Sequence, residues 1–103
     1  MKEKINTPIQ TTVNSGGQTY LALVFTRDTG VSDATCVVEQ SLDLQSWNSG
    51  SSYNAAGSTP TNAFTTEVSR VPASPGRETI VVRETVPLNA RPQSFLRFKA
   101  TMP

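Results

Sequence analysis

Acid–base chemistry in this chain would have to come from carboxylates, because its 103 residues include no histidine. Two carboxylates can hydrolyse a glycosidic bond when one acts as the acid and the other as the nucleophile or base. The candidates are Glu39, Asp43, Glu67, Glu78 and Glu84. We expect them on strand exteriors and in turns, where such groups ordinarily pair with basic side chains of neighbouring strands. The basic side chains available are Arg70, Arg83, Arg97 and Lys99. We therefore expect no enzyme active site.

Metal and thiol chemistry have few residues to draw on. Cys36 is the only cysteine, so it forms no disulfide within the chain, and its apolar and β-branched neighbours favour a buried, inert thiol. A zinc site needs clustered cysteines and histidines. Asp28 and Asp33 could together hold calcium, but the turn chemistry of a loop that contains Gly30 accounts for both carboxylates. No metal and no cofactor is expected.

Trp47, the only tryptophan, follows a polar turn over residues 41–46. A tryptophan in this position ordinarily folds back over the end of the core, because burial of its large ring is favourable while the indole N–H finds an acceptor. On that interpretation, Trp47→Ala would strongly destabilise the domain. The alternative is an exposed ring that stacks on a sugar or a partner, with Tyr53 or Tyr20 completing the ligand platform.

Strands rather than helices must position these residues. Apolar and polar residues alternate with the period of two that is typical of β-strands, and no helical period of useful length occurs. This alternation covers residues 8–13, 18–27, 34–40, 63–71, 77–85 and 94–101. Residues 48–62 are predicted to be a long connection with one brief strand near Tyr53 and Ala55–Ala56. These patterns predict an all-β fold, an antiparallel β-sandwich of six to seven strands, immunoglobulin-like, fibronectin-like or jelly-roll-like.

The same alternation predicts which side chains face the core. In residues 18–27, one face carries Leu21, Leu23 and Phe25, and the other carries Tyr20, Ala22 and Val24. Because both faces are apolar, this strand is either central or in contact with a partner. In the following strand, Cys36 and Val38 are expected to point inward together.

The length of the chain allows one domain, which we place at residues 15–103 after an N-terminal arm at residues 1–14. A net charge of +1 and a pI of 7.9 provide no basic field for nucleic acid. The chain has no run of about 18 apolar residues, so no membrane span is predicted. Its first residues also lack the apolar segment of an export signal. Localisation stays open, with an extracellular surface or a virion favoured.

Four stretches carry a resemblance to a known family. They are L-V-F-T-R at 23–27, T-C-V-V-E-Q-S-L-D-L-Q-S-W at 35–47, V-V-R-E-T-V-P-L at 81–88 and S-F-L-R-F-K-A at 94–100. Together they resemble the small β-sandwich modules at the C-terminal ends of large secreted and surface proteins of Verrucomicrobia and Planctomycetes. The resemblance spans residues 20–101, and Cys36 stands where the family usually has an aromatic residue. It implies a surface β-sandwich without catalytic residues.

Three classes of function remain. The one we favour is a non-catalytic structural subunit that assembles with copies of itself, as a filament, coat or decoration protein. The others are a carbohydrate- or cell-surface-binding module of a secreted bacterial protein and a passive terminal module.

The N-terminal arm is the main reason to favour assembly. Its polar sequence cannot offset its own ordering entropy, whereas an open sheet edge of a neighbouring copy could accept it as an added strand. The alternative is that the arm pairs with its own domain as a first strand. The residues expected to mediate assembly are Ile5, Ile9, Val13, Tyr20, Ala22 and Val24.

Overall fold

The structure, a computed structural model, consists of strands joined by turns and loops. It describes residues 8–28, 35–54, 57–74, 76–90 and 93–101, and these contain eight strands and no helix. The strands are β1 (Ile9–Ser15), β2 (Gln18–Asp28), β3 (Thr35–Ser41), β4 (Asn48–Asn54), β5 (Gly57–Thr59), β6 (Thr65–Ser74), β7 (Arg77–Glu84) and β8 (Phe95–Thr101).

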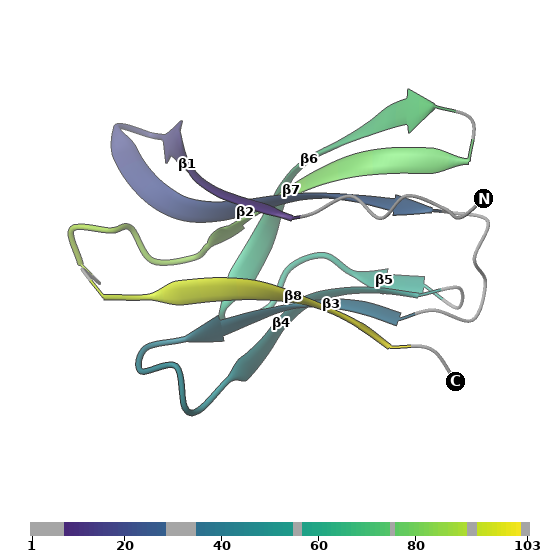
Figure 1. The fold of residues 1–103 in the computed structure, drawn as a ribbon. Helices are drawn as coiled ribbons and strands as arrows, with labels where there is room; N and C mark the ends of the chain where they lie inside the picture. The colour runs from purple at the N-terminus through teal and green to yellow at the C-terminus, as the bar shows by residue number, and fades with distance from the viewer. Residues whose placement is uncertain (1–7, 29–34, 55–56, 75, 91–92, 102–103) are drawn as a thin grey trace.

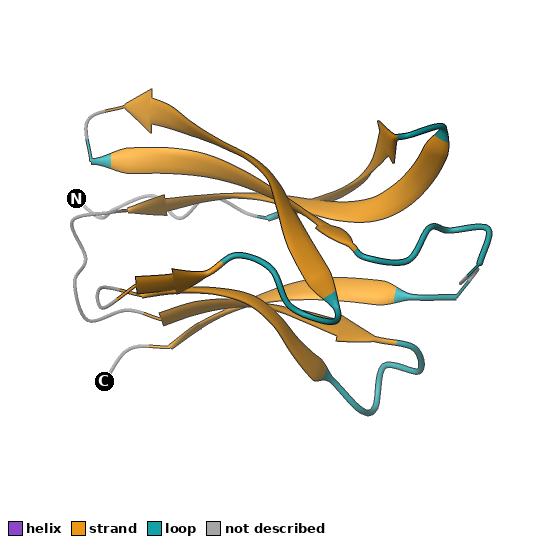
Figure 2. Ribbon diagram, turned by 180° about the vertical axis from the view of Figure 1, so that it is seen from behind, coloured by secondary structure: helices purple, strands orange, loops and turns teal. Residues whose placement is uncertain are grey.

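The strands form two antiparallel four-stranded sheets that pack together, as Figures 1 and 2 show from opposite sides. The first sheet has the order β1-β2-β7-β6, and the second has the order β5-β4-β3-β8. The sheets meet through β2 against β8 and β4 against β6. The prediction of an all-β, antiparallel two-layer fold is confirmed, but the described residues contain eight strands rather than six or seven.

The additional strands are β4 and β5, in the region predicted to be a long connection. Serine, glycine and asparagine dominate β4 and have low strand propensity, so the pattern indicated only one brief strand near Tyr53. Tertiary contacts override that propensity, because Tyr53 is fully buried at 0% exposure and lies opposite Cys36 of β3. The expectation of a mostly irregular segment at residues 48–62 is therefore wrong.

The core lies between the two sheets. Phe25 is at its centre, 5.9 Å from Tyr53 and 4.7 Å from Phe98 between ring centroids. The remaining buried members are aliphatic: Leu21, Leu23, Val38, Ile80, Val82 and Leu96. Cys36 packs against this cluster from β3, so the inward orientation predicted for Cys36 and Val38 is confirmed.

Part of the expected N-terminal arm is the first strand of the domain itself. Residues 9–15 pair in register with residues 18–24 of β2 through the turn at Gly16 and Gly17. Both glycines have positive φ, at 58° and 81°, which glycine adopts without steric cost. For residues 9–14 of the arm, the alternative therefore holds: they pair with their own domain as its first strand. Residues 1–7 lie outside the described residues.

A close approach between the sheets occurs at Gly50 of β4. A Cβ atom at this position would lie 2.8 Å from the carbonyl oxygen of Val38 and closer still to Oγ1 of Thr65 in β6. The Ser51 N–H donates to the same Thr65 hydroxyl over 2.6 Å. The absence of a side chain at Gly50 thus allows β4 and β6 to make a direct polar contact.

We predict that Gly50→Ala lowers the free energy of unfolding by about 3 kcal/mol, because the added methyl group overpacks the interface between the sheets. Urea denaturation followed by circular dichroism measures this loss. Gly76→Ala is the matched control, since its Cβ would meet nothing within 4 Å and its φ of 79° costs only about 1 kcal/mol. Equal losses in the two variants would show that packing at Gly50 is not the constraint.

Candidate functional site

Those residues expected to mediate assembly that the structure describes lie on the outer face of the first sheet, which is the face turned away from the second sheet. The strand register places Ile9, Val24 and Val81 side by side across β1, β2 and β7. Val13 and Tyr20 form a neighbouring pair on the same face. Because Leu21, Leu23 and Phe25 of β2 point into the core, the alternate residues of β2 must point outward.

Three of the largest exposed apolar side chains belong to this outer face. Ile9, Val68 and Val71 are 62%, 47% and 56% exposed. Val71 lies opposite the outward-facing Thr79, and Val68 is the extra residue of a β-bulge in β6. Contiguous exposed apolar surface on a folded protein ordinarily marks an interaction site.

One of the expected assembly residues, Ala22, points to this face but is at 0% exposure, because neighbouring side chains cover it. Ile5 lies outside the described residues. Tyr20, Val24 and Val13 are partly buried, which leaves Ile9 as the most exposed of the five described residues.

The outer face is hollowed between its two edge strands. Val13, Asn14 and Ser15 of β1 and residues 66–68 of β6 line a single hollow of about 270 Å³, with Arg83 of β7 also contributing. Strands β1 and β6 are separated by β2 and β7 in the sheet, so one hollow can touch both only if the face is concave. Figure 1 shows the two hairpins of this sheet bending away from the second sheet at their ends.

Arg83 is the cationic side chain of this hollow, and its charge is already engaged. Its guanidinium carbon lies 3.9 Å from the ring centroid of Tyr20, a cation–π contact. Its Nη1 also donates to the Glu84 carbonyl oxygen over 2.9 Å. The outer face therefore presents apolar and hydroxyl groups together with a cation that lies over an aromatic ring.

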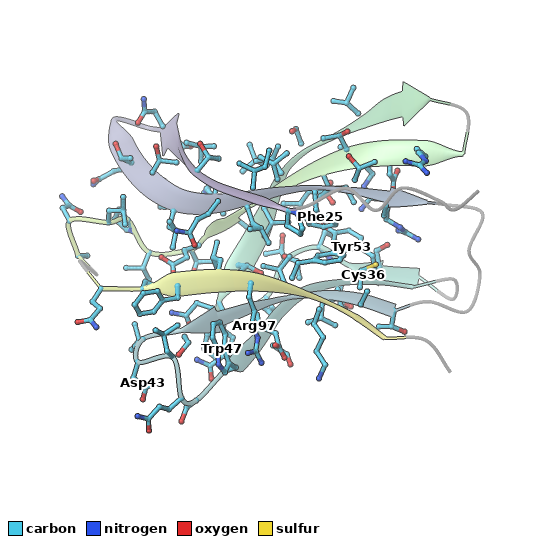
Figure 3. All side chains as sticks on the ribbon, viewed as in Figure 1. Phe25, Cys36, Asp43, Trp47, Tyr53 and Arg97 are labelled. Carbon is cyan, nitrogen blue, oxygen red and sulfur yellow. The ribbon has the colours of Figure 1, made fainter. Side chains whose placement is uncertain are left out.

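Trp47 lies on the opposite side of the molecule and does not plug the core. It is only partly buried, and the Arg97 guanidinium carbon is 3.9 Å from its ring centroid. Figure 3 shows Trp47 and Arg97 on the side of the second sheet that faces away from Phe25 and Tyr53. The expectation of a buried plug is therefore wrong. The chain leaves the turn on the outside of β3 and β8, where the indole stacks with the Arg97 guanidinium instead.

The turn before Trp47 has the polar construction predicted from its sequence. Oδ1 of Asp43 accepts the N–H groups of Gln45 and Ser46 at 2.8 and 2.9 Å, and Oγ of Ser41 accepts that of Leu44 at 2.8 Å. The backbone hydrogen bonds from Ser46 and Gln45 lower the pKa of the Asp43 carboxyl. The turn is thus closed locally, and it holds Trp47 at the start of β4.

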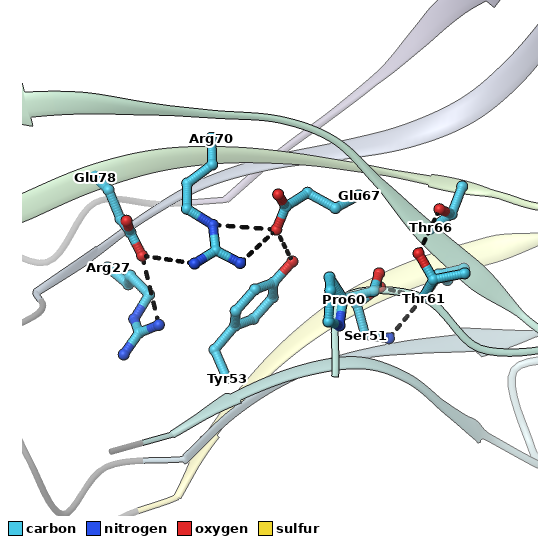
Figure 4. Close-up of polar contacts among 10 residues, drawn as sticks. Arg27, Ser51, Tyr53, Pro60, Thr61, Thr66, Glu67, Arg70 and Glu78 are labelled. Carbon is cyan, nitrogen blue, oxygen red and sulfur yellow. Dashed lines mark hydrogen bonds and ion pairs between the residues drawn. The ribbon is translucent and has the colours of Figure 1, made fainter. Parts of the chain in front are cut away.

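Tyr53 cannot act as a ligand platform, because its ring is fully buried between the sheets. Its hydroxyl donates to Oε1 of Glu67 over 2.7 Å, and the same oxygen accepts two hydrogen bonds from Arg70 at 2.8 and 3.2 Å. Figure 4 shows how Glu78 and Arg27 extend this cluster through ion pairs. The sequence offered no signal for the cluster, since its members come from β2, β4, β6 and β7.

The electrostatics of this cluster follow from partial burial and close pairing. Burial raises the pKa of Tyr53, and the hydrogen bond to Glu67 and the charge of Glu67 raise it further. For Glu67, burial alone would raise the pKa, but hydrogen bonds from Arg70 and Tyr53 and the Arg70 charge hold it below its ordinary value. The cluster thus favours a neutral phenol beside an ionised carboxylate.

Three of the candidate carboxylates, Glu39, Glu67 and Glu78, pair with arginines. Glu39 accepts a hydrogen bond from Arg97 over 2.7 Å across β3 and β8, as expected for cross-strand pairing. Glu67 and Glu78 belong to the arginine cluster. Glu84 is at 0% exposure, so its expected exterior position is wrong.

Glu84 belongs to a second polar connection between the sheets. Ser94 donates to its Oε2, and the same hydroxyl accepts a hydrogen bond from Nε2 of Gln40 over 3.0 Å. Asn48 of β4 then donates to Oε1 of Gln40 over 3.0 Å. These contacts assign Glu84 a structural role, because a buried carboxylate is tolerated only with hydrogen-bonding partners.

The thiol of Cys36 is about half buried. Burial raises its pKa, and the charge of Arg27 opposes that rise. A raised pKa reduces the thiolate fraction and so the reactivity. The inertness of Cys36 towards thiol reagents stays a prediction.

Metal and membrane signals are absent from the part of the chain that the structure describes. No group of three or more metal-binding side chains gathers among those residues, and none of their segments is a helix with the length and apolarity needed to cross a bilayer. The possible calcium pair falls outside this description, because Asp33 and the side chain of Asp28 are not among the described groups.

We predict that Trp47→Ala costs about 1–2 kcal/mol, because it removes a partly exposed ring and its cation–π contact. Phe25→Ala should cost about 3–5 kcal/mol, because Phe25 is 2% exposed at the centre of the core. Denaturation followed by circular dichroism compares both variants with the parent. If both variants lose the same stability, Trp47 belongs to the core after all.

We also predict that Glu67 contributes to the acid sensitivity of the fold. Because its folded pKa is below the ordinary value of 4.5, its contribution is present above that pH and is lost as the pH falls through the folded pKa. Glu67→Gln should therefore lose less stability than the parent between about pH 5 and about pH 3. Parallel urea titrations at these pH values measure the difference. A slope identical to that of the parent would contradict the lowered pKa.

Comparisons with known proteins assign no relative to this chain. No family model, curated protein or solved structure matches it. The resemblance to modules of Verrucomicrobia and Planctomycetes therefore stays a prediction, and the function must be argued from the surfaces described above.

Proposed function

We propose that the protein is a non-catalytic structural subunit that assembles with copies of itself through the outer face of the first sheet. The observation that carries this proposal is the exposure of Ile9, Val68 and Val71 on one concave face. Burial of apolar surface is the main favourable term in protein association. An assembly that covers this face would remove three branched aliphatic side chains from water.

The size of the face suits such an interface. Its four strands contain 7, 11, 8 and 10 residues. With strands about 4.8 Å apart and a rise of about 3.3 Å per residue, the face measures about 19 Å by about 23–36 Å. The projected area is then about 450–700 Å², and the accessible area of a surface with side chains is larger. Standard interfaces bury about 800 Å² per partner.

The partners of the carboxylates support the proposal that the protein is non-catalytic. Glu39, Glu67 and Glu78 each face an arginine, and Asp43 is occupied by backbone N–H groups. Carboxylates paired with arginines in this way are common on sheets and each contributes only modestly to stability. A working acid and base would instead share an open cleft.

We infer further that the sandwich is immunoglobulin-like rather than jelly-roll-like. The order β1-β2-β7-β6 corresponds to strands A-B-E-D of that fold, and β5-β4-β3-β8 corresponds to C″-C′-C-F. In this reading the strand called G has no counterpart among the described residues. The expected setting is a virion, filament or cell surface, where small sandwiches serve as repeated building units.

A second candidate function is binding of a carbohydrate or cell surface through Trp47. The observation in its favour is a partly exposed indole beside the Glu39–Arg97 pair on the outer side of the second sheet. Arg97 covers one side of the ring, however, which leaves less of it for stacking on a sugar. Glycan binding that is lost in a folded Trp47→Ala protein would favour this candidate over assembly.

For the main proposal, we predict that the parent forms oligomers whose mass rises with concentration. Val68→Glu combined with Val71→Glu should lower that mass at every concentration, because charged side chains would have to be buried at the outer-face interface. Sedimentation velocity measures the masses, and circular dichroism shows that the fold is kept. The matched control is Leu42→Glu with Leu44→Glu, since these leucines are 51% and 57% exposed elsewhere. A parent that is monomeric at every concentration would overturn the proposal.

A further inference from the structure

We propose that two copies of the chain join edge to edge, with β1 of one copy pairing antiparallel with β1 of the other about a two-fold axis. This inference rests on the proposed self-assembly and adds to it a second contact, made by an edge strand. A strand at the edge of a sheet has one row of backbone N–H and C=O groups directed away from its own sheet. These groups can pair with another chain unless something prevents it.

Two of the four sheet edges in the described part of the chain are protected by length or charge. Strand β5 contains only three residues, Gly57–Thr59, too few for an extended ladder. Strand β8 carries Arg97 and Lys99, both exposed. Charged residues on an edge strand, especially lysine, oppose pairing with a second strand.

The edge formed by β6 is blocked along its length. It contains Pro72, which has no N–H to donate, and register shifts near Val68 and between Pro72 and Ser74. Its start is already covered from outside, because the Glu67 N–H donates to the Pro60 carbonyl over 2.9 Å. An added strand would have to displace that segment and follow an irregular backbone.

Strand β1 has none of these protections. All seven residues from Ile9 to Ser15 pair with β2 without a register shift. The strand contains no charged residue and no proline, and four of its seven residues are β-branched. Among the described residues no strand lies on its other side. Since the other edges are protected, the edge best suited to pair with β1 is β1 of a second copy.

A symmetric register follows from the length of the strand. Full overlap of Ile9–Ser15 with itself places Thr12 opposite Thr12 on the two-fold axis. Odd-numbered residues of one copy then lie opposite odd-numbered residues of the other. The outward-facing Ile9 and Val13 therefore lie on the same side of the joined sheet in both copies. Opposed threonines are also a favourable cross-strand pair.

The pairing would make the two outer faces continuous. Val13 of β1 lines the hollow of the first sheet, and in this register Val13 of one copy lies opposite Thr11 of the other. Two four-stranded sheets become one eight-stranded sheet with a shared apolar face. On the other side of β1, Gln10, Thr12 and Asn14 are polar and exposed. These side chains can therefore stay in contact with water in the dimer.

Thr12 allows the edge to be tested without altering the outer face, because it points to the opposite side of β1. Thr12→Lys places two lysines directly opposite each other and should raise the dimer dissociation constant about fivefold to tenfold. Thr12→Glu should do the same, and an equimolar mixture of the two variants should recover the parent's affinity through Lys–Glu pairs. Ser58→Lys, an exposed site on β5, is the control and should associate like the parent. Sedimentation velocity over a concentration series measures all four samples.

The outcomes separate this inference from the proposed function. Weakening by each Thr12 variant with recovery in the mixture supports edge pairing. If Thr12→Lys and Thr12→Glu associate like the parent while the Val68 and Val71 double variant dissociates, edge pairing is overturned and assembly through the outer face stands. A parent that stays monomeric overturns both.

Discussion

Burial of Tyr53 between the sheets is the constraint on which the rest of this structure depends. Strand β4 has no other large apolar side chain, so this one ring ties it to the core formed by Phe25 and its neighbours. A buried phenol needs a hydrogen-bond partner, and Glu67 of the opposite sheet provides it. Glu67 in turn needs a counter-charge, which Arg70 supplies. One aromatic residue thereby fixes the position of both sheets.

Two further polar contacts join the sheets around the same core. Ser51 and Thr65 share a hydrogen bond where Gly50 allows the backbones to approach. At another point Gln40 and Glu84 are linked through the hydroxyl of Ser94. Because buried polar groups are costly without partners, these contacts favour one relative arrangement of the sheets over sliding alternatives. A core of this modest size benefits from such specificity.

The same arrangement decides which surfaces are left for partners. The core faces of β2 and β7 are covered, while their outer faces remain apolar beside Ile9 and Val71. Three sheet edges carry charge, proline, irregular register or a very short strand, and the β1 edge carries none of these. Because the other edges and the core faces are protected or covered, the apolar outer face and the β1 edge are the surfaces from which we infer contact with a partner. Both lie on the first sheet, and they share β1.

Sequence alone determined the class of fold and which side chains share a face of each strand. The period of two places Leu21 with Leu23 and Ile80 with Val82, because alternation along a strand is a local property. The structure then decided that these faces point into the core. Polar turn chemistry around Asp43 was likewise readable, since its hydrogen bonds span only a few residues. Only the tertiary structure could decide the exposure of Trp47, the burial of Tyr53 and Glu84, and the strand identity of β4. Each depends on contacts between residues far apart in the chain, and for those contacts local propensity carries no information.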